Sequence, residues 1–302
     1  MHTSSNMKGI ILSAAGFSSW ALGDALIKYL TGFYSIYAIV FYNALFSSII
    51  FMAVSPWLGG LRRTFQTKKM KLHLLRGLLF FVQMVMIIYG FSQMSLAKTY
   101  AIVFSAPFMA ALLSIPLLKE TIRPAQWLSI ALGFGGILVI LRPGIIPLDT
   151  ATLSVMGGAL AFAITNIAVR FIEKPGTHTE TILSWGLLPE LLITVCAGAM
   201  LLPHFVFPAA AHLPHMLGVA LSSAFGIISI SLAFRHAAPA VAAPFHYIQM
   251  LWGVVLGYLI FGDLLDIWTA MGGAIIIISG LWLIWQERNG NTKTPTAPPP
   301  SP

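Results

Sequence analysis

Long apolar runs separated by short polar segments dominate this chain. A helix needs about 20 predominantly apolar residues to cross a bilayer. The runs here are continuous rather than alternating, which predicts helices and not the strands of a membrane barrel. Ten spans are predicted, at 10–30, 36–55, 74–93, 99–118, 125–141, 152–172, 181–202, 215–234, 241–260 and 267–286.

Composition places these helices in a membrane rather than in a soluble core. Of 302 residues, 58% are hydrophobic and 9% are charged, against roughly 25% charged in an ordinary soluble domain. The first span is too long for a cleaved secretory signal and has no small-residue cleavage site after it, so we expect it to remain as a membrane helix. The fold class predicted is all-α and integral to the membrane.

Positive charge is distributed unevenly between the two predicted faces. With a cytoplasmic N-terminus, 14 of the 17 basic residues fall on cytoplasmic segments and helix ends, Arg76 among them, and only Lys28, Lys98 and Arg142 fall outside. The positive-inside rule therefore favours ten crossings, with residues 1–9 and a disordered tail at 287–302 both cytoplasmic. The net charge of +8 is explained by loops that face anionic membrane lipid, and it requires no nucleic-acid partner.

The two halves of the chain are weakly similar to each other. Residues 89–120 align with 232–263 at an offset of 143, which places Glu120 on Asp263. At an offset of 142, Asp24 falls on Asn166 and Lys28 on Arg170. Each half holds five spans, and an odd number inverts the second half in the membrane. We expect inverted repeats at 10–144 and 152–286, joined by 145–151, with a substrate site between them.

Residues 74–144 carry a recognisable pattern. It consists of Arg76-Gly77, Pro107, Glu120, Trp127, Gly135-Gly136 and a closing RPG at 142–144. This stretch resembles the EamA-type repeat of the drug/metabolite transporter superfamily. The second half is similar more loosely, since it has Asp263 in place of Glu and Met250 in place of the proline.

The resemblance implies a secondary transporter of the bacterial inner membrane, with a central cavity lined mainly by spans 1, 3, 4, 6, 8 and 9. It implies a small organic substrate that is amino-acid-, vitamin- or nucleoside-like, and the first half is most similar to branches that take up S-adenosylmethionine or riboflavin. No cofactor is implied. A channel and a scaffold or sensor are the alternatives, and monomer and homodimer both stay open.

An enzyme or a metal centre is disfavoured by the residues themselves. The chain has no HExxH motif and no GxSxG nucleophile paired with an intramembrane base. Its single cysteine, Cys196, excludes an intramolecular disulfide and a cysteine-based zinc site.

Glu190 follows Pro189 near the middle of the seventh span. A charged side chain there costs about 2.5–3.5 kcal/mol on insertion scales, so it needs a partner, a proton or a watery cavity. Two interpretations are open. Glu190 binds a coupling proton or cation, or it makes a structural hydrogen bond to a neighbouring helix.

Asp24 and Lys28 are one helical turn apart near the outer end of the first span, where an ion pair forms readily. They predict a site for a zwitterion, a gate, or a mutually neutralised pair with Lys28 reaching towards the surface. Their repeat equivalents, Asn166 and Arg170, would form the matching cytoplasmic gate, with Asn166 also expected to contact substrate.

The ninth span contains the stretch PFHYIQMLW. His246 and Gln249 share a helical face with Gly253, which we expect to leave room for a ligand, and His246 is a second candidate proton carrier. Tyr247, Trp252 and Trp20 are predicted to stack on the substrate, and Gln83 to hydrogen-bond it. Glu120 and Asp263 are expected to be structural, because acids favour the positive start of the following helix.

Overall fold

The computed structural model describes residues 2–119, 124–142, 149–173, 179–237 and 239–291, and all regular structure in these ranges is helical. The α-helices of the first half are α1 (His2–Leu30), α2 (Ile36–Ala53), α3 (Leu61–Phe65), α4 (Met70–Gln93), α5 (Leu96–Val103), α6 (Ala106–Leu118) and α7 (Pro124–Leu141). Those of the second half are α8 (Thr150–Ile172), α9 (Ile182–Leu201), α10 (Leu213–His236), α11 (Pro239–Ala242), α12 (Ile248–Phe261) and α13 (Ile267–Asn291). Short 3-10 helices are η1 (Ser55–Trp57), η2 (Leu202–His204) and η3 (Ala243–Tyr247).

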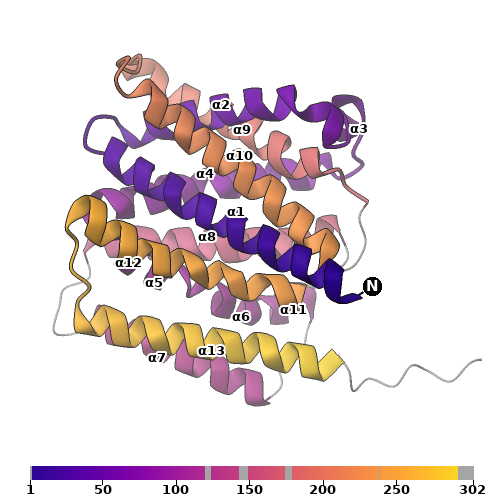
Figure 1. The fold of residues 1–302 in the computed structure, drawn as a ribbon, viewed down its shortest axis with the longest axis vertical. Helices are drawn as coiled ribbons and strands as arrows, with labels where there is room; N and C mark the ends of the chain where they lie inside the picture. The colour runs from indigo at the N-terminus through magenta and orange to yellow at the C-terminus, as the bar shows by residue number, and fades with distance from the viewer. Residues whose placement is uncertain (1, 120–123, 143–148, 174–178, 238, 292–302) are drawn as a thin grey trace, which may run out of the picture.

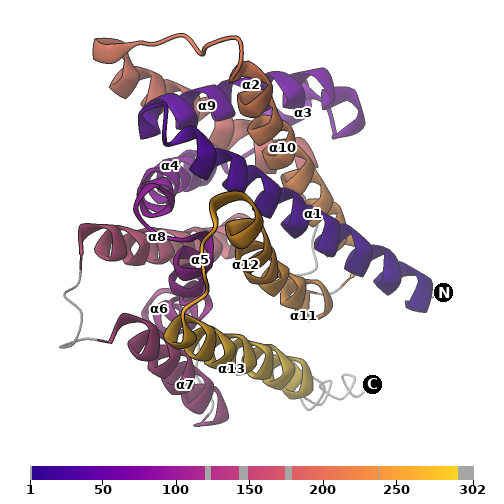
Figure 2. The same ribbon diagram turned by 60° about the vertical axis from the view of Figure 1, so that its left-hand side comes forward.

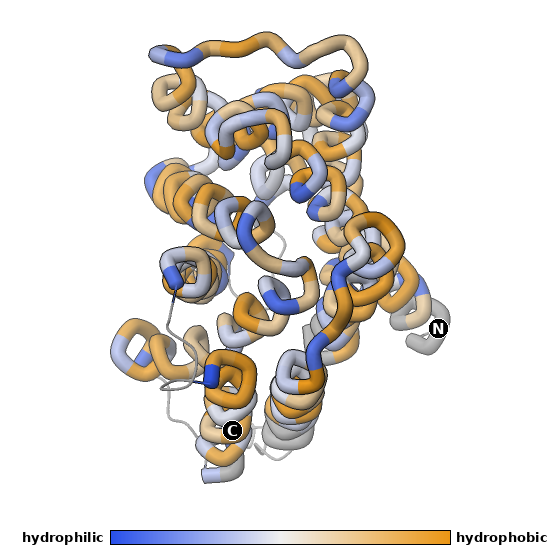
Figure 3. The backbone as a smooth tube through the Cα atoms, turned by 90° about the vertical axis from the view of Figure 1, so that its left-hand side faces the viewer, coloured by the Kyte–Doolittle hydropathy of each residue, from blue (hydrophilic) through white to orange (hydrophobic). Residues whose placement is uncertain are grey.

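Every predicted span coincides with helix in the described residues. Eight helical segments are long and apolar enough to cross a membrane, and two shorter apolar helices, Gln126–Leu141 and Ile267–Leu283, occupy the fifth and tenth predicted spans. Hydrophobic positions predominate along the helices, with hydrophilic positions interspersed among them and in several of the connections (Figure 3). The all-helical membrane fold is thus established, and the count of ten crossings stays a prediction.

The long helices run side by side across the molecule (Figure 1). The start of α1 and the end of α13 lie at the same end of the bundle, as Figures 1 and 2 both show. We call this the proximal end. The opposite, distal end holds the end of α1 at Leu30, the α4–α5 connection and the end of α12 at Phe261.

Four pairs of helices build the bundle: α1 packs on α10, α4 on α8, α2 on α9, and α7 on α13. The α7–α13 pair forms a separate layer below the rest (Figure 2). Glycine permits the closest of these approaches, since a Cβ on Gly136 in α7 would lie 2.8 Å from the carbonyl oxygen of Gly272 in α13. Gly136 and Gly272 therefore allow the two helices to pack closely at this contact.

Two of the predicted spans are broken helices. The fourth is divided at Phe104 and Ser105 into α5 and α6, with Pro107 in the first turn of α6. The ninth consists of α11, η3 and α12, with Pro244 in the first turn of η3. Proline has no N–H group, so it is tolerated in a first turn and ends the helix that precedes it. Both breaks lie at the centre of the molecule, beside the cavity described next.

Candidate functional site

A cavity of about 170 Å³ lies between the helices of both halves of the chain. A single water needs only about 10–15 Å³ of such space, so the cavity has room for a small solute. Polar and aromatic side chains from α1, α2, α4, α5, α8, α9, α10, η3 and α12 line it. They are Trp20, Asp24, Asn43, Arg76, Phe80, Gln83, Phe91, Tyr100, Phe104, Phe162, Trp185, Glu190, Ser223, His246 and Gln249.

Six of the predicted site residues line this cavity: Trp20, Asp24, Gln83, Glu190, His246 and Gln249. The His246 ring stacks on Phe17, with centroids 4.6 Å apart, and lies edge-on to Phe104 at 4.9 Å. The indole nitrogen of Trp20 donates to the carbonyl of Ser223 at 3.3 Å. Residues widely separated in sequence are thus brought to one space.

Two aromatic residues predicted to stack on the substrate do not line the cavity. The hydroxyl of Tyr247 approaches Gly280 of α13, and its ring lies 5.1 Å from that of Phe104. The indole nitrogen of Trp252 donates to the Ser18 hydroxyl at 2.8 Å. The 3-10 geometry of η3 changes the direction of side chains after Ala243, so a helical face drawn through the whole span misplaces them.

The expected ligand space beside Gly253 is filled. A Cβ at Gly253 would lie 2.5 Å from the Tyr100 ring. The glycine therefore admits a tyrosine from α5 rather than a ligand, and α12 packs directly on α5 at this point.

The predicted pairing of Asp24 with Lys28 is wrong. The Lys28 Nζ lies 2.7 Å from Asp263 Oδ2, donates to the Met94 carbonyl at 3.0 Å, and lies 4.8 Å from the centre of the Phe261 ring. The ammonium thereby joins α1 to the end of α12 and to the α4–α5 connection. Lys28 thus pairs with an acid 235 residues away in the sequence, while Asp24, one turn away, is engaged by Tyr100. Asp263 was expected to interact with the positive start of the following helix, and it forms this ion pair instead. Glu120, for which the same was expected, lies outside the described residues.

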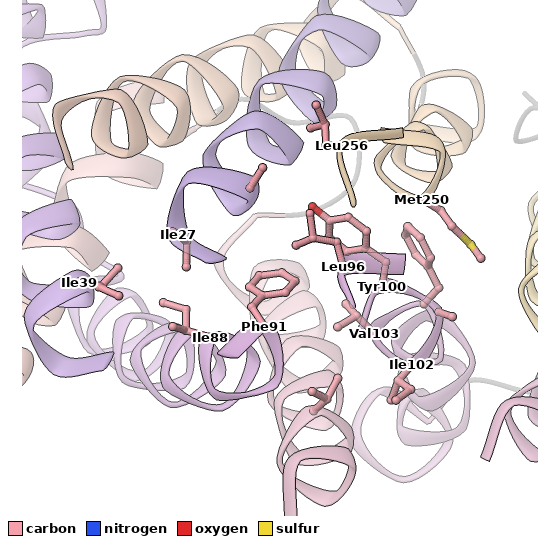
Figure 4. Close-up of a cluster of buried hydrophobic side chains, with 14 of the residues drawn as sticks. Ile27, Ile39, Ile88, Phe91, Leu96, Tyr100, Ile102, Val103, Met250 and Leu256 are labelled. Atoms are coloured by element: carbon pink, nitrogen blue, oxygen red, sulfur yellow. The ribbon is translucent and has the colours of Figure 1, made fainter. Parts of the chain in front are cut away.

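Asp24 instead accepts a hydrogen bond of 2.7 Å from the Tyr100 hydroxyl. Tyr100 lies in the apolar cluster at the distal end, between α1, α4 and α12, among Phe91, Leu96 and Leu256 (Figure 4). This contact and the Lys28–Asp263 pair both lie at the distal end.

The repeat equivalents of this pair lie elsewhere. Asn166 and Arg170 are exposed on α8, towards its proximal end, and neither lines the cavity. In this conformation Asn166 does not share a space with the other predicted substrate contacts.

Arg76 is the main functional candidate that sequence reasoning missed. It was counted among the cytoplasmic helix ends, but α4 begins at Met70, which places Arg76 in the second turn of the helix. Its side chain lines the cavity, with the residue only 8% exposed. The guanidinium donates from Nη1 to the Trp185 carbonyl at 2.9 Å and lies about 5 Å from the centres of the Phe80 and Trp185 rings. The signal was available, because Arg76 already falls within the predicted span 74–93.

Glu190 lies on the same wall of the cavity. It is 5% exposed, and its Oε2 has no hydrogen-bond partner in the described structure. A Cβ at Gly77 would lie 3.2 Å from the Pro189 Cα, so α4 and α9 approach closely where they carry Arg76 and Glu190. Helix α9 is the seventh span, which is not among the spans expected to line the cavity mainly, yet it contributes Trp185, Gly186, Pro189, Glu190 and Ile193 to the lining.

Comparison with known proteins identifies this architecture. The sequence profile of the EamA-like transporter family matches residues 7–142. The first half of the chain is thus similar to the EamA-like transporter family.

Relatives of this EamA-like chain are bacterial transporters. An S-adenosylmethionine uptake transporter of Rickettsia prowazekii is 24% identical over 282 residues, which cover 93% of this chain and 94% of the relative. A riboflavin transporter of Rhizobium johnstonii is 28% identical over 207 residues, 68% of this chain and 67% of its own. A crystal structure of a protein 11% identical in sequence shares the fold, with a TM-score of 0.65 over 95% of this chain and 99% of its own. The EamA-like chain is therefore a multi-pass membrane transporter and not an enzyme.

The two ends of the cavity in this EamA-like chain are packed differently. At the distal end, α5 packs on α12. At the proximal end, the described parts of α6 make no comparable contact with α11 or η3. The two ends thus differ in how closely the broken spans pack against each other.

A second polar cluster lies at the proximal surface. Glu180 accepts from the Thr67 hydroxyl at 2.7 Å and lies 3.5 Å from the buried His73 ring, while Arg235 donates to the Glu180 carbonyl at 3.0 Å. These contacts tie α9 and α10 to the start of α4. In the described ranges, no three His, Cys, Asp or Glu side chains gather in a way that could hold a metal ion.

Proposed function

We propose that this EamA-like protein is a secondary active transporter that moves a small organic metabolite across the bacterial inner membrane by alternating access. The observation that carries the proposal is the central cavity, which receives buried polar side chains from both halves of the chain. Residues 10–144 and 152–286 would be the two inverted repeats, joined by 145–151, with residues 1–9 and 287–302 in the cytoplasm.

The packing of the helices supports an inverted repeat. An exchange of the two halves places α1 on α8, α2 on α9, α4 on α10, α6 on α12 and α7 on α13. The α1–α10 contact then corresponds to the α8–α4 contact, and the α1–α12 contact to the α8–α6 contact. All four contacts are present. The same exchange turns the α10–α2 contact into the α4–α9 contact, and both of these are present. The α2–α9 and α7–α13 pairs map onto themselves. A two-fold relation between the halves requires such a pattern.

Local backbone features recur at the offset that relates the halves in sequence. At an offset of 143, Phe104 falls on Tyr247, and these residues stand at the break before α6 and at the junction before α12. Lys119 and Gly262, also 143 apart, both end their helices in the left-handed conformation, with φ of 56° and 69°. The Phe104 and Tyr247 rings touch each other, as equivalent residues do near a two-fold axis.

Alternating access needs a barrier that opens on one side while another closes. We propose that the Lys28–Asp263 pair and the Asp24–Tyr100 bond form the distal barrier, which is closed here. Asn166 and Arg170, at the proximal end of α8, would belong to the matching barrier on the other side. With the predicted cytoplasmic termini, this conformation faces inward.

The substrate class proposed is amino-acid-, vitamin- or nucleoside-like, with S-adenosylmethionine and riboflavin as the first compounds to test. Relatives named for both compounds cover two thirds or more of this chain. The cavity offers aromatic rings for a planar group, including Trp20 and Phe162, and buried polar groups for the rest.

Counterflow in proteoliposomes tests the function. Purified full-length protein is reconstituted with unlabelled S-adenosylmethionine or riboflavin inside, and labelled compound is added outside. A carrier gives saturable uptake with a transient overshoot. Uptake that is linear in concentration without overshoot would indicate a channel, and no uptake of any metabolite tested would indicate a scaffold or sensor.

Proton coupling is a separate part of the proposal, with Glu190 and His246 as the candidate carriers. We expect an imposed pH gradient to drive uptake in the wild type and not in the Glu190→Gln variant, in which counterflow without a gradient persists when the substrate is saturating. Gradient-driven uptake that is unchanged in this variant and also in His246→Gln would remove both residues from coupling. Reporter fusions at the two ends test the cytoplasmic termini, and light scattering distinguishes monomer from homodimer.

A further inference from the structure

We propose that Arg76 and Glu190 form a subsite for the zwitterionic head of an α-amino acid, with the carboxylate on the Arg76 guanidinium and the ammonium on the Glu190 carboxylate. This inference rests on the proposed transport function and names the chemistry of its substrate. It begins from two buried side chains of opposite charge on one cavity wall.

Each of the two groups has polar atoms that the described protein leaves unused. Arg76 donates from Nη1 to a carbonyl, while its Nε has no hydrogen-bond partner. Glu190 Oε2 likewise has none. A buried polar atom without a partner costs about 1–3 kcal/mol, and more when it is charged. A ligand that offers an acceptor to Arg76 and donors to Glu190 removes this cost.

The two charges do not satisfy each other. Their helices approach closely at Gly77 and Pro189, but no ion pair within 4.0 Å joins the two side chains in the described structure. The guanidinium is instead held between the Phe80 and Trp185 rings. An α-amino acid carries a carboxylate and an ammonium on adjacent atoms, so it fits a place where separated opposite charges face one cavity. A planar guanidinium is also well suited to bind a carboxylate through two hydrogen bonds.

The rest of the ligand would extend along α4. Arg76, Phe80, Gln83 and Ile87 follow each other at helical spacing and all line the cavity. Gln83 is two turns from Arg76, about 10 Å along the axis, and its buried Oε1 has no hydrogen-bond partner in the described structure. A ligand about that long, with a planar group beside the aromatic lining and an N–H or O–H at its far end, would satisfy all three side chains.

Binding to purified full-length protein tests the subsite with pairs of probes that differ only in the head. S-adenosylmethionine and its decarboxylated form differ by the carboxylate alone. Tryptophan, tryptamine and indole-3-propionate form a second series that removes the carboxylate or the ammonium. By calorimetry, we expect the amino-acid form of the series that binds to bind roughly 10- to 100-fold more tightly than the analogue without the carboxylate.

The Arg76→Gln variant should bind the amino acid and its decarboxylated analogue equally, and Arg76→Lys should restore part of the difference. Glu190→Gln should reduce affinity for the amino acid while leaving indole-3-propionate unaffected. The matched control is Arg62→Gln, because Arg62 is an exposed arginine outside the cavity. A thermal melt shows whether each variant is folded. If Arg76→Gln does not fold, the comparison is made with Arg76→Lys instead.

Three outcomes would overturn the subsite. One is equal affinity of the wild type for both members of a pair. Another is a loss in Arg76→Gln that is the same for both members, which indicates a structural role. The third is binding and counterflow of riboflavin, which has no amino-acid head, together with no binding of either amino-acid series. Failure of the transport function is distinct, because the wild type would then bind a probe and show no counterflow of it.

Discussion

The charged groups at the two ends of the cavity differ in whether they have partners within the protein. At the distal end, Lys28 is paired with Asp263, and Asp24 accepts from Tyr100. In the proximal half, Arg76 Nε and Glu190 Oε2 have no hydrogen-bond partner in the described structure. Both ends are partly buried in an apolar protein, so the difference cannot be attributed to solvent alone.

The difference separates two uses of buried charge. A polar group that is fully partnered across helices holds those helices together, since breaking the contact leaves a group unsatisfied. A polar group that faces a cavity can have donor or acceptor atoms without a protein partner. Those atoms do not join one helix to another, and they are available to bind a ligand. Under the two proposals made above, the distal pairs serve as a barrier and the proximal groups as a binding site. The predictions below test this division.

Removing the distal ion pair should have the largest effect. In Lys28→Met, Asp263 loses its cationic partner, which we expect to cost the distally closed conformer about 2–3 kcal/mol. The ratio of open to closed conformers should rise roughly 30- to 150-fold. Because Cys196 is the single cysteine, a cysteine placed at Ile27 in a Cys196→Ala background reports access from the distal side to an impermeant maleimide.

The control for this experiment is Lys98→Met, since Lys98 is also a distal lysine and forms no ion pair within 4.0 Å in the described structure. Exchanging the charges, with Lys28→Asp and Asp263→Lys together, should restore slow labelling. Labelling of Lys28→Met at the wild-type rate would mean that the pair does not hold the barrier.

A pair of identical substitutions on α12 should act with opposite signs. In Gly253→Ala, the new methyl group would lie 2.5 Å from the Tyr100 ring, and displacing that ring should lower the free energy of unfolding by about 1–3 kcal/mol. In Gly257→Ala, the nearest atoms belong to Asp263 at an ordinary 3.7 Å, so the gain in helix propensity, about 0.5–1 kcal/mol, should dominate. Melting followed by tryptophan fluorescence measures both, and a stabilised Gly253→Ala would show that the α5–α12 contact is loose.

The sequence predicted the helices well because hydropathy reports how much of a segment can lie in lipid, and this requires no knowledge of neighbours. It also brought Asp24, Glu190 and His246 into consideration, since polar residues in apolar runs are conspicuous. All three line the cavity.

Side-chain partners were harder to predict. Lys28 was expected to pair within its own helix because spacing along one helix is visible in a sequence, whereas the approach of Asp263 depends on how α12 ends beside α1. Arg76 was missed for a different reason. A basic residue near a helix end is equally consistent with a lipid-facing loop, and only the packing of Gly77 on Pro189 shows that it is buried.

Removing the Tyr100 hydroxyl should have a smaller effect than removing the ion pair. Tyr100→Phe keeps the ring that packs in the distal cluster and deletes the donor to Asp24. We expect the distally closed conformer to lose about 1–2 kcal/mol, seen as faster labelling at position 27. Tyr89→Phe is the matched control, because the Tyr89 hydroxyl bonds Thr150 at an exposed site outside the cavity. Equal effects of the two variants would argue against a special role for the Asp24 contact.

The smallest effect is expected from an acid that is partnered but lies at neither end of the cavity. Asp149 caps α8 by accepting from the Thr152 backbone N–H at 2.6 Å, and this bond lowers the pKa of Asp149 below its ordinary value. Asp149→Ala should lower the free energy of unfolding by about 1 kcal/mol at neutral pH. Since the folded state favours the ionised acid, that contribution should be complete above about pH 4 and disappear as the pH falls through the lowered pKa. Melting curves of the wild type and the variant should therefore converge in acid, while counterflow at neutral pH is unchanged. An increase in labelling at position 27 in Asp149→Ala as large as that in Lys28→Met would show that partnered acids act alike wherever they lie, and the division between barrier and binding site would then fail.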